Sequence, residues 1–125
     1  MSKVKNGMLK LVSSDSRRDL FEAELPDSAI TKLVVKDDAR PLGQHFHKRK
    51  IEVFLFLEGS GLYKTALVNE VGQFIGLLCV TQVVPGTVIK VPPWHAHRAD
   101  LAPGTVFVCF SSEPFDPDDM VPCPI

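Results

Sequence analysis

Residues 42–61 read LGQHFHKRKIEVFLFLEGSG, and this stretch decides the fold of the chain. The run from 51 to 59 contains β-branched, aromatic and leucine residues and ends at a glycine, which is typical of a buried strand leading into a turn. Alternate residues of a strand point to opposite faces, and both faces are apolar here: Phe54 and Phe56 on one, Val53, Leu55 and Leu57 on the other. A sheet with one face in water would alternate apolar and polar residues. We therefore expect both faces to be covered, by a second sheet layer and a loop or by a second subunit, and we favour a homodimer.

The same kind of segment recurs along the rest of the chain. Further runs rich in Val, Ile, Leu, Phe and Thr are separated by Gly and Pro turns, and we expect a strand in each of them: 8–12, 20–25, 30–36, 43–47, 61–69, 72–84, 87–91, 95–101 and 105–112. One helical turn is expected at 14–19. About ten short strands at this spacing predict an all-β sandwich or barrel rather than an α/β protein.

The length of 125 residues fits one domain, which we place at 1–125. Its core is expected at about 30–112, with N-terminal strands within 8–25 in front of it. The segment 113–125 reads EPFDPDDMVPCPI and contains four prolines. Because proline cannot donate a hydrogen bond to a strand ladder, we expect this C-terminal arm to be extended and to lie on the surface or on a partner.

The composition is that of an ordinary soluble globular protein, with 45% hydrophobic residues, 23% charged residues and a formal net charge of -1. No apolar run reaches the roughly 18 residues that a membrane span needs, and no basic stripe favours nucleic acid as a partner. The first residues lack the apolar run of a secretory signal. Cys79, Cys109 and Cys123 form no CxxC pair, and the first two sit in apolar runs, where cysteine behaves as a small buried hydrophobe. We expect a reducing, cytoplasmic setting.

All four histidines occur in two H-x-H pairs, His45 with His47 and His95 with His97. In a strand, residues two apart share a face, so each pair can direct two imidazoles into one interior. Glu52 follows His47 after four residues, which is enough for the chain to turn and bring a carboxylate alongside. A lone histidine in a strand is more often structural, but this arrangement favours a divalent metal site for Fe, Mn, Ni, Co or Zn. Spacing alone leaves open which member of the second pair is the ligand.

Two segments resemble the motifs of the cupin family. The first, at 42–61, matches the family pattern of H-x-H, three or four residues, Glu, six residues and Gly with His45, His47, Glu52 and Gly59. The second, GTVIKVPPWHAH, resembles the other cupin motif with Gly86, Pro92 and His97. The resemblance implies a double-stranded β-helix, or jelly-roll barrel, that binds a metal ion, with His97 as the fourth ligand. Trp94 stands where the motif has a glycine, which predicts a turn of different shape before His97.

Several side chains are candidates for contact with a substrate. If Glu52 points inward, so do Phe54 and Phe56, which would form an apolar wall. The candidates for substrate contact are His95, Phe54, Tyr63 and Arg98. For His95 a surface position beside a turn is an equal alternative. Tyr63 belongs to a group that can line the cavity but is more often plain core, with Phe74, Phe107 and Cys109.

Three consecutive cations, Lys48, Arg49 and Lys50, lie between two of the expected strands. Such a run is most often a solvated hairpin tip. In the alternative interpretation, Arg49 or Lys50, or Arg98 after the last histidine, binds an anionic group such as a carboxylate or a phosphate. Trp94 either packs the turn, which we favour, or covers the barrel mouth.

The cupin resemblance implies a fold and a metal but no particular reaction, because one fold hosts many functions. We expect a metal-dependent enzyme acting on a small polar substrate, with isomerase or epimerase chemistry on a sugar or dioxygenase chemistry on a small acid. The alternative is a binding or sensor module without catalysis. In both cases the expected partner is a small molecule, with no nucleic acid and no membrane.

Overall fold

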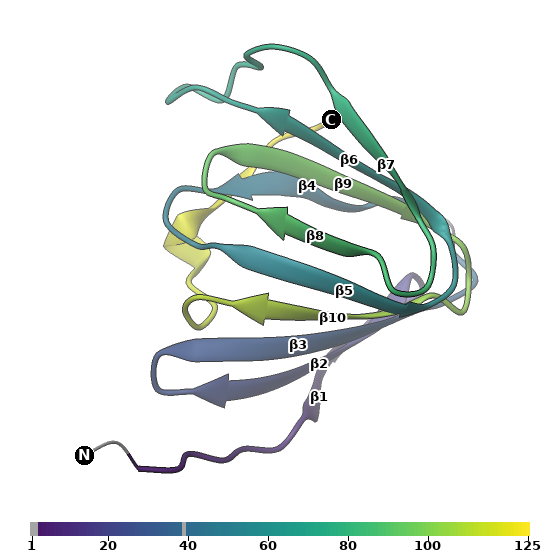
Figure 1. Cartoon of the computed structure of the whole chain (residues 1–125), viewed down its shortest axis with the longest axis vertical. Helices are drawn as coiled ribbons and strands as arrows, with labels where there is room; N and C mark the ends of the chain where they lie inside the picture. The colour runs from purple at the N-terminus through teal and green to yellow at the C-terminus, as the bar shows by residue number, and fades with distance from the viewer. Residues whose placement is uncertain (1–2, 39) are drawn as a thin grey trace.

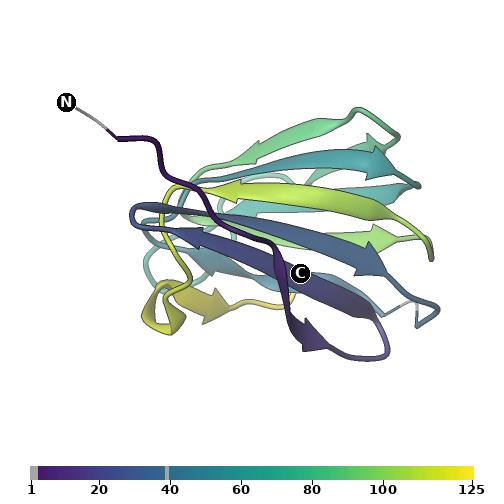
Figure 2. The same cartoon turned by 90° about the horizontal axis from the view of Figure 1, so that it is seen from below.

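The computed structural model describes residues 3–38 and 40–125, which fold into two antiparallel sheets that face each other (Figure 1, Figure 2). Within these residues the chain forms eleven strands and one short 3-10 helix. The all-β prediction is confirmed, and the two facing sheets form the predicted jelly-roll barrel. Within the same ranges, no helix has the length and apolar character needed to span a bilayer.

Six strands form the first sheet, in the order β1-β2-β3-β10-β5-β8. Their bounds are β1 Lys10–Ser14, β2 Arg18–Leu25, β3 Ser28–Val35, β10 Val106–Ser111, β5 Glu52–Glu58 and β8 Val88–Val91. The second sheet has the order β11-β4-β9-β6-β7. Its strands are β11 Met120–Pro122, β4 Leu42–His47, β9 His95–Leu101, β6 Gly61–Leu67 and β7 Cys79–Val83. Strands far apart in the chain are neighbours in both sheets.

The core lies between the two sheets and includes the inner face of β5. Phe56 on that face is fully buried, and Phe54 is 7% exposed. Other core residues come from both sheets: Val35, Leu42, Tyr63, Val83, Val91, Ala99, Leu101, Phe107 and Cys109. The turn after β5 is tight, because Gly59 has φ +94° and Thr105 packs where a Cβ would stand. Only glycine fits this position, which explains the glycine of the first motif.

The outer face of β5 is less covered than its inner face. Val53 and Leu55 are half-buried, and Leu57 is 47% exposed. A single chain therefore covers only one of the two apolar faces of this strand completely. Cover by a second subunit stays a prediction.

Two local predictions in the first and second sheets are wrong. The stretch 14–19 is a hairpin turn between β1 and β2 and not a helical turn, because the Asp15 carboxylate accepts the backbone N–H groups of Arg17 and Arg18 at 2.8 and 3.1 Å. In the predicted strand 72–84, only Cys79–Val83 is a strand. The part before it turns back through Asn69, whose side-chain oxygen accepts two backbone N–H groups, and Cys79 is exposed rather than buried.

The C-terminal arm, 113–125, is part of the fold rather than a segment lying on its surface. After the 3-10 helix η1, Pro117–Asp119, the strand β11 pairs with β4 at the edge of the second sheet (Figure 1). Pro122 is tolerated because β11 is the outermost strand and has one free side. Behind β4, Cys123 packs with Phe46 in a second, smaller core cluster.

Candidate metal centre

The strand that carries the first two histidines contains a β-bulge. Gly43 and Gln44 have φ values of +85° and +61°, and the register between β4 and β9 shifts between Gly43 and His45. A Cβ on Gly43 would lie 2.8 Å from the carbonyl oxygen of His97. The absence of a side chain therefore allows β4 to approach β9 closely, and the bulge sets the direction of the histidines that follow.

The structure brings His45, His47, Glu52 and His97 together. One ligand atom from each of them lies within 4.8 Å of the others. The histidines belong to β4 and β9 of the second sheet, whereas Glu52 is the first residue of β5 in the first sheet. The cluster therefore joins the two sheets, and its members are the four ligands that the sequence predicts.

Backbone carbonyl groups orient two of the imidazole rings. His47 Nδ1 lies 3.2 Å from the carbonyl oxygen of Asp119, and His97 Nδ1 lies 3.3 Å from that of His95. Because a carbonyl oxygen only accepts, each Nδ1 must carry the proton for these hydrogen bonds to form. The Nε2 atoms are then left with lone pairs, and they lie 3.1 Å (His47) and 3.8 Å (His97) from Glu52 Oε1.

The Glu52 carboxylate is 8% exposed and only half satisfied. Its Oε2 accepts a hydrogen bond from the Cys109 thiol at 3.4 Å, whereas the buried Oε1 has no hydrogen-bond partner among the described residues. A proton-free Nε2 facing a carboxylate oxygen at 3.1 Å is a contact between two electron-rich atoms. A cation between them removes the conflict. The donor set of imidazole nitrogens and one carboxylate fits a divalent transition metal.

The ionisation of the cluster also fits a cation. Burial raises the pKa of Glu52, but a hydrogen bond from His47 and positive charge on His97, His47 and Lys50 outweigh this effect and hold its pKa at about 2. When the imidazoles are neutral, a bound cation supplies the positive charge in their place. Burial, with the neighbouring His97 and His47, lowers the pKa of His45 to about 3. Burial likewise lowers the pKa of His97. At neutral pH the carboxylate is charged and these two imidazoles are neutral, which is the state in which both bind metals.

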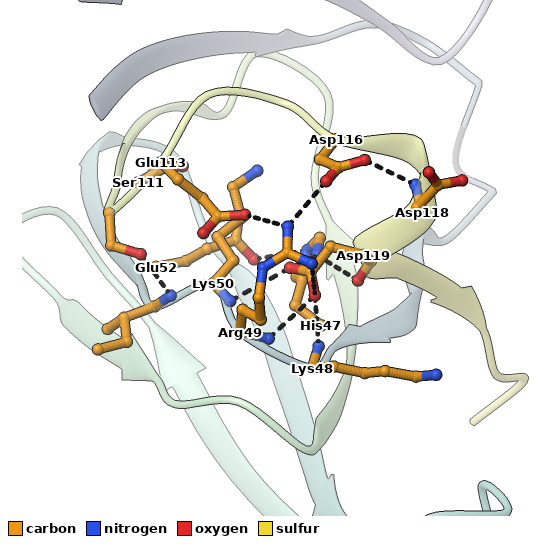
Figure 3. A network of polar contacts seen from close by, with 12 residues as sticks. His47, Lys48, Arg49, Lys50, Glu52, Ser111, Glu113, Asp116, Asp118 and Asp119 are labelled. Atoms are coloured by element: carbon orange, nitrogen blue, oxygen red, sulfur yellow. Dashed lines mark hydrogen bonds and ion pairs between the residues drawn. The ribbon is translucent and has the colours of Figure 1, made fainter. Parts of the chain in front are cut away.

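The C-terminal arm holds the loop between His47 and Glu52 (Figure 3). The Asp119 carboxylate, 1% exposed, accepts the backbone N–H groups of Lys48, Arg49 and Lys50 at 3.0, 2.9 and 3.2 Å. Its backbone carbonyl is the group that receives His47 Nδ1. Sequence reasoning missed Asp119, because no local spacing links it to a loop about seventy residues earlier.

A cavity of about 210 Å³ adjoins the cluster between the sheets. Its wall includes apolar side chains such as Leu20, Leu33, Phe54, Phe107 and Phe115. Tyr63 and Cys109 also line it, and burial raises the pKa of both groups, so both stay protonated at neutral pH. The Tyr63 hydroxyl is buried and has no hydrogen-bond partner within the described part of the chain.

The predicted substrate-contacting residues divide into two groups. Phe54 and Tyr63 line the cavity, as do Phe107 and Cys109, and contact with a substrate stays a prediction. His95 does not line the wall: it begins β9, and its ring contacts the Pro93 carbonyl.

Arg98 and Phe74 do not line the cavity either. Arg98 follows the inward-facing His97 and therefore points to the other face, where it binds Asp100 and the backbone of Ile125. Phe74 is exposed in the turn region before β7.

Trp94 adopts the backbone conformation that glycine would adopt. Its φ is +66°, in the left-handed region, so the turn keeps a glycine-like backbone despite the large side chain. The backbone N–H of Trp94 donates to the backbone carbonyl of His47 at 2.7 Å. The indole ring stacks on Phe46, with 5.8 Å between the ring centroids. A different turn shape from that of the family motif stays a prediction. The preferred interpretation of Trp94 as a residue that packs the turn is confirmed.

No protein-family model matches the sequence, and no curated protein sequence matches it. Solved structures do match the fold. The capsular polysaccharide assembling protein CapF from Staphylococcus aureus is 20% identical over 98% of this chain, with a TM-score of 0.74. This chain covers 33% of CapF, so it spans about a third of that protein's length.

Two further solved proteins also match the fold. Pac13, described as a nucleoside dehydratase, is 14% identical, with 99% of this chain and 93% of that chain covered and a TM-score of 0.68. Variants of Pac13 from Streptomyces have been crystallised with uridine. Hazelnut vicilin is 16% identical over 82% of this chain and 30% of its own, with a TM-score of 0.67. These are proteins of the cupin fold, and the chain described here has that fold.

Proposed function

We propose that this domain binds one divalent transition metal ion through His45, His47, Glu52 and His97 and that it is a metal-dependent enzyme acting on a small molecule. The observation that carries the proposal is Glu52 Oε1, a buried carboxylate oxygen with no hydrogen-bond partner among the described residues, 3.1 Å from His47 Nε2. An unpaired buried carboxylate is costly, and a cation compensates it. Bound there, such an ion supplies Lewis-acid polarisation of a substrate oxygen.

The residues of the chain supply the surroundings that such chemistry needs. Phe54 and Phe107 exclude water from the wall beside the cluster, which strengthens every charge interaction inside. The protonated Tyr63 hydroxyl offers one hydrogen-bond donor to a bound molecule. Cys109 holds the second oxygen of Glu52 and so fixes its orientation.

The cavity wall favours dioxygenase-like chemistry over sugar isomerisation or epimerisation. A sugar presents several hydroxyl groups, and each loses free energy when it leaves water without a new partner. Most of the wall is aliphatic or aromatic and offers few such partners. A substrate with one or two polar groups on an apolar body is better matched.

The ligand set is tested by metal analysis of protein purified without added metal. We expect close to one transition-metal ion per chain, lost in His97→Ala. His95→Ala is the matched control, because it makes the same chemical change two residues away and should keep its metal. Equal metal content in the two folded variants would show that the proposed ligand set is wrong.

A binding or sensor module is the second candidate, and the protonated state of Tyr63 and Cys109 favours it, because neither group can act as a general base at neutral pH. Oxygen-consumption and sugar-isomerisation assays with iron-, manganese- and nickel-loaded protein separate the two candidates. Turnover with any metal supports the enzyme. No turnover with fully loaded protein favours the module.

A further inference from the structure

The loop between β4 and β5 carries three consecutive cations, and the structure separates their roles. Lys48 is exposed. Arg49 is exposed too, and its guanidinium binds Glu113 and Asp116 at 2.8 Å each (Figure 3). Lys50 is 9% exposed and lines the cavity beside the metal cluster. Only the third cation is therefore placed to meet a molecule in the cavity.

Lys50 makes no direct ion pair among the described residues, although its charge lowers the pKa of the nearby Glu52 carboxylate. Within residues 3–38 and 40–125, its Nζ makes no hydrogen bond and has no carboxylate oxygen within 4.0 Å, although other cations of the chain do form such pairs. The backbone of Lys50 is held in place, since its N–H donates to the Asp119 carboxylate at 3.2 Å. Its Nζ is not among the buried side-chain atoms without a hydrogen-bond partner, so the ammonium group still reaches accessible space. An anion in the cavity would give this group a direct charge partner, which no described side chain provides.

The two carboxylates on the cavity wall do not meet this need. Glu52 is turned to the imidazoles and Cys109, and Glu22 on β2 forms no ion pair with any residue that the structure describes. With a divalent ion in place, the ion and Lys50 bring three positive charges against these two negative ones. A bound anion balances the excess.

The remaining wall limits the body of that anion. An apolar cavity of about 150 Å³ holds benzene, so about 210 Å³ accommodates one ring with a small substituent. Phe54, Tyr63 and Phe107 pack around the space, with ring centroids 5.3 Å apart between Phe54 and Tyr63 and 5.9 Å apart between Phe54 and Phe107. The unpaired Tyr63 hydroxyl supplies one further hydrogen-bond donor.

We infer that the cavity takes a small organic acid, with a carboxylate on an apolar body of about one ring, and that Lys50 binds the carboxylate. This inference deepens the proposed function and rests on it for the role of the metal ion. It selects Lys50 among the three cations considered from the sequence, because Arg49 is engaged on the surface and Arg98 lies on the opposite face of β9.

Benzoate and benzamide test the inference, because they share size and shape and differ in charge. Binding is measured by isothermal titration calorimetry on the full chain, both metal-loaded and metal-free. We expect benzoate to bind at least about tenfold more tightly than benzamide, since hydrogen bonds between charged groups are about twice as strong as neutral ones. Lys50→Met should abolish this preference. Lys48→Met, which removes the same charge from an exposed position of the same loop, should preserve it.

Three results would overturn the inference: equal binding of the two probes, no saturable binding of benzoate, or an unchanged preference in Lys50→Met. If Lys50→Met does not fold, Lys50→Gln replaces it, since it removes the charge and keeps a polar end. The metal content of the same samples separates the two proposals. Full metal content without a preference for benzoate would contradict the inference that the cavity binds an organic acid. It would not contradict the proposed metal site. A preference that depends on Lys50 in protein without affinity for metal supports Lys50 and contradicts the proposed function.

Discussion

At the scale of single residues, Asp119 connects the C-terminal arm to the proposed ligand His47. Its carboxylate collects three backbone N–H groups of the loop 48–50, and its carbonyl fixes the His47 ring through Nδ1. Partners of this kind set the orientation and tautomer of a ligating histidine. Asp119 is thus a positioning residue that never needs to touch the ion.

Asp119→Asn is expected to weaken metal binding by about 10–100-fold, the range typical of such supporting partners. An amide places N–H donors among the loop N–H groups, so the side chain no longer holds the loop. The backbone carbonyl of residue 119 is then expected to move away from His47 Nδ1. Competition with a chelator measures the affinity. Asp118→Asn, an exposed neighbour in the same 3-10 helix, is the control and should bind like the unchanged protein. Equal affinities in the two variants would contradict this role of Asp119.

His45, His47 and Glu52 could be predicted from the sequence because their geometry is local: i and i+2 in one strand, and a short return to the next strand. For His97 the prediction depended on the resemblance to the second cupin motif, because spacing alone left His95 as an alternative. The alternation of side chains along a strand could also have excluded Arg98 as a residue that contacts the substrate. The neighbour of an inward-facing His97 must face outward. Asp119 and Cys109 could not be predicted as partners of His47 and Glu52. Each acts across a strand pairing that no sequence spacing reveals.

At the scale of elements, the arm 113–125 does three things at once. It adds β11 to the edge of β4, it supplies Asp119 to the loop, and it places Cys123 against Phe46. A covered edge also removes a strand that could pair with another chain. The arm therefore contributes to stability as well as to the site.

Truncation after Ser112 is expected to lower the melting temperature by more than about 5 °C, because β4 loses its pairing with β11. Metal affinity should fall as well, because His47 loses the backbone carbonyl that accepts from its Nδ1. Differential scanning calorimetry and chelator competition measure the two effects. A variant lacking residues 3–9, which lie outside any strand, is the control for removing a terminal segment. An unchanged melting temperature after loss of the arm would contradict its structural role.

The β1–β2 hairpin is expected to loosen in acid. Hydrogen bonds from the Arg17 side chain and backbone lower the pKa of Asp15 from its ordinary value of 3.8 to about 2. A carboxylate whose pKa is lowered by folding stabilises the fold above its ordinary pKa, and its contribution fades as the pH falls from about 4 to about 2. Hydrogen exchange of β1 and β2 amides across this range measures the effect. In Asp15→Ala these amides should exchange faster at neutral pH and lose this dependence.

The elements themselves follow from local pattern, which is why most predicted strands are confirmed. The failures share a cause: side-chain hydrogen bonds to the backbone override the apolar pattern. Asp15 turns the segment expected to be helical, and Asn69 bends the start of the run expected to be one long strand. Such turns arise from a single oxygen and leave little trace in hydrophobic periodicity.

At the scale of the whole molecule, the outer face of the first sheet carries an apolar patch. Phe110, 46% exposed, stands between Ile30 and Val53 in register. Two lysines interrupt the face, since Lys32 pairs with Val108 and Lys90 pairs with Val53. An apolar patch with a polar rim is typical of an interaction surface. It agrees with the homodimer predicted from the two apolar faces of β5, which remains to be measured.

Phe110→Glu is expected to convert a dimer into a monomer without loss of metal, since the substituted side chain lies on the face away from the cluster. Sedimentation velocity at tens of micromolar, together with metal analysis, measures both properties. Phe74→Glu places the same charge on an exposed aromatic position of the turn before β7 and should remain dimeric. A monomeric unchanged protein would contradict the predicted dimer.

The pairing of strands across the molecule is the part that the sequence does not reveal. β3 pairs with β10 and β4 pairs with β9, although the paired residues lie more than about fifty positions apart in the chain. Pairings of this range depend on the packing of two complete sheets and leave no local signature.

The chain passes back and forth between the two sheets, so the proposed ligands are synthesised at different times. As the chain leaves the ribosome, His45, His47 and Glu52 emerge early, but His97 follows only after β8, and Asp119 later still. A nascent chain that has not yet released β9 therefore offers an ion three of the four clustered ligands and no anchor for His47. A chain that has not yet released the arm would bind the ion more weakly, so release of the arm marks the moment at which the proposed site is complete.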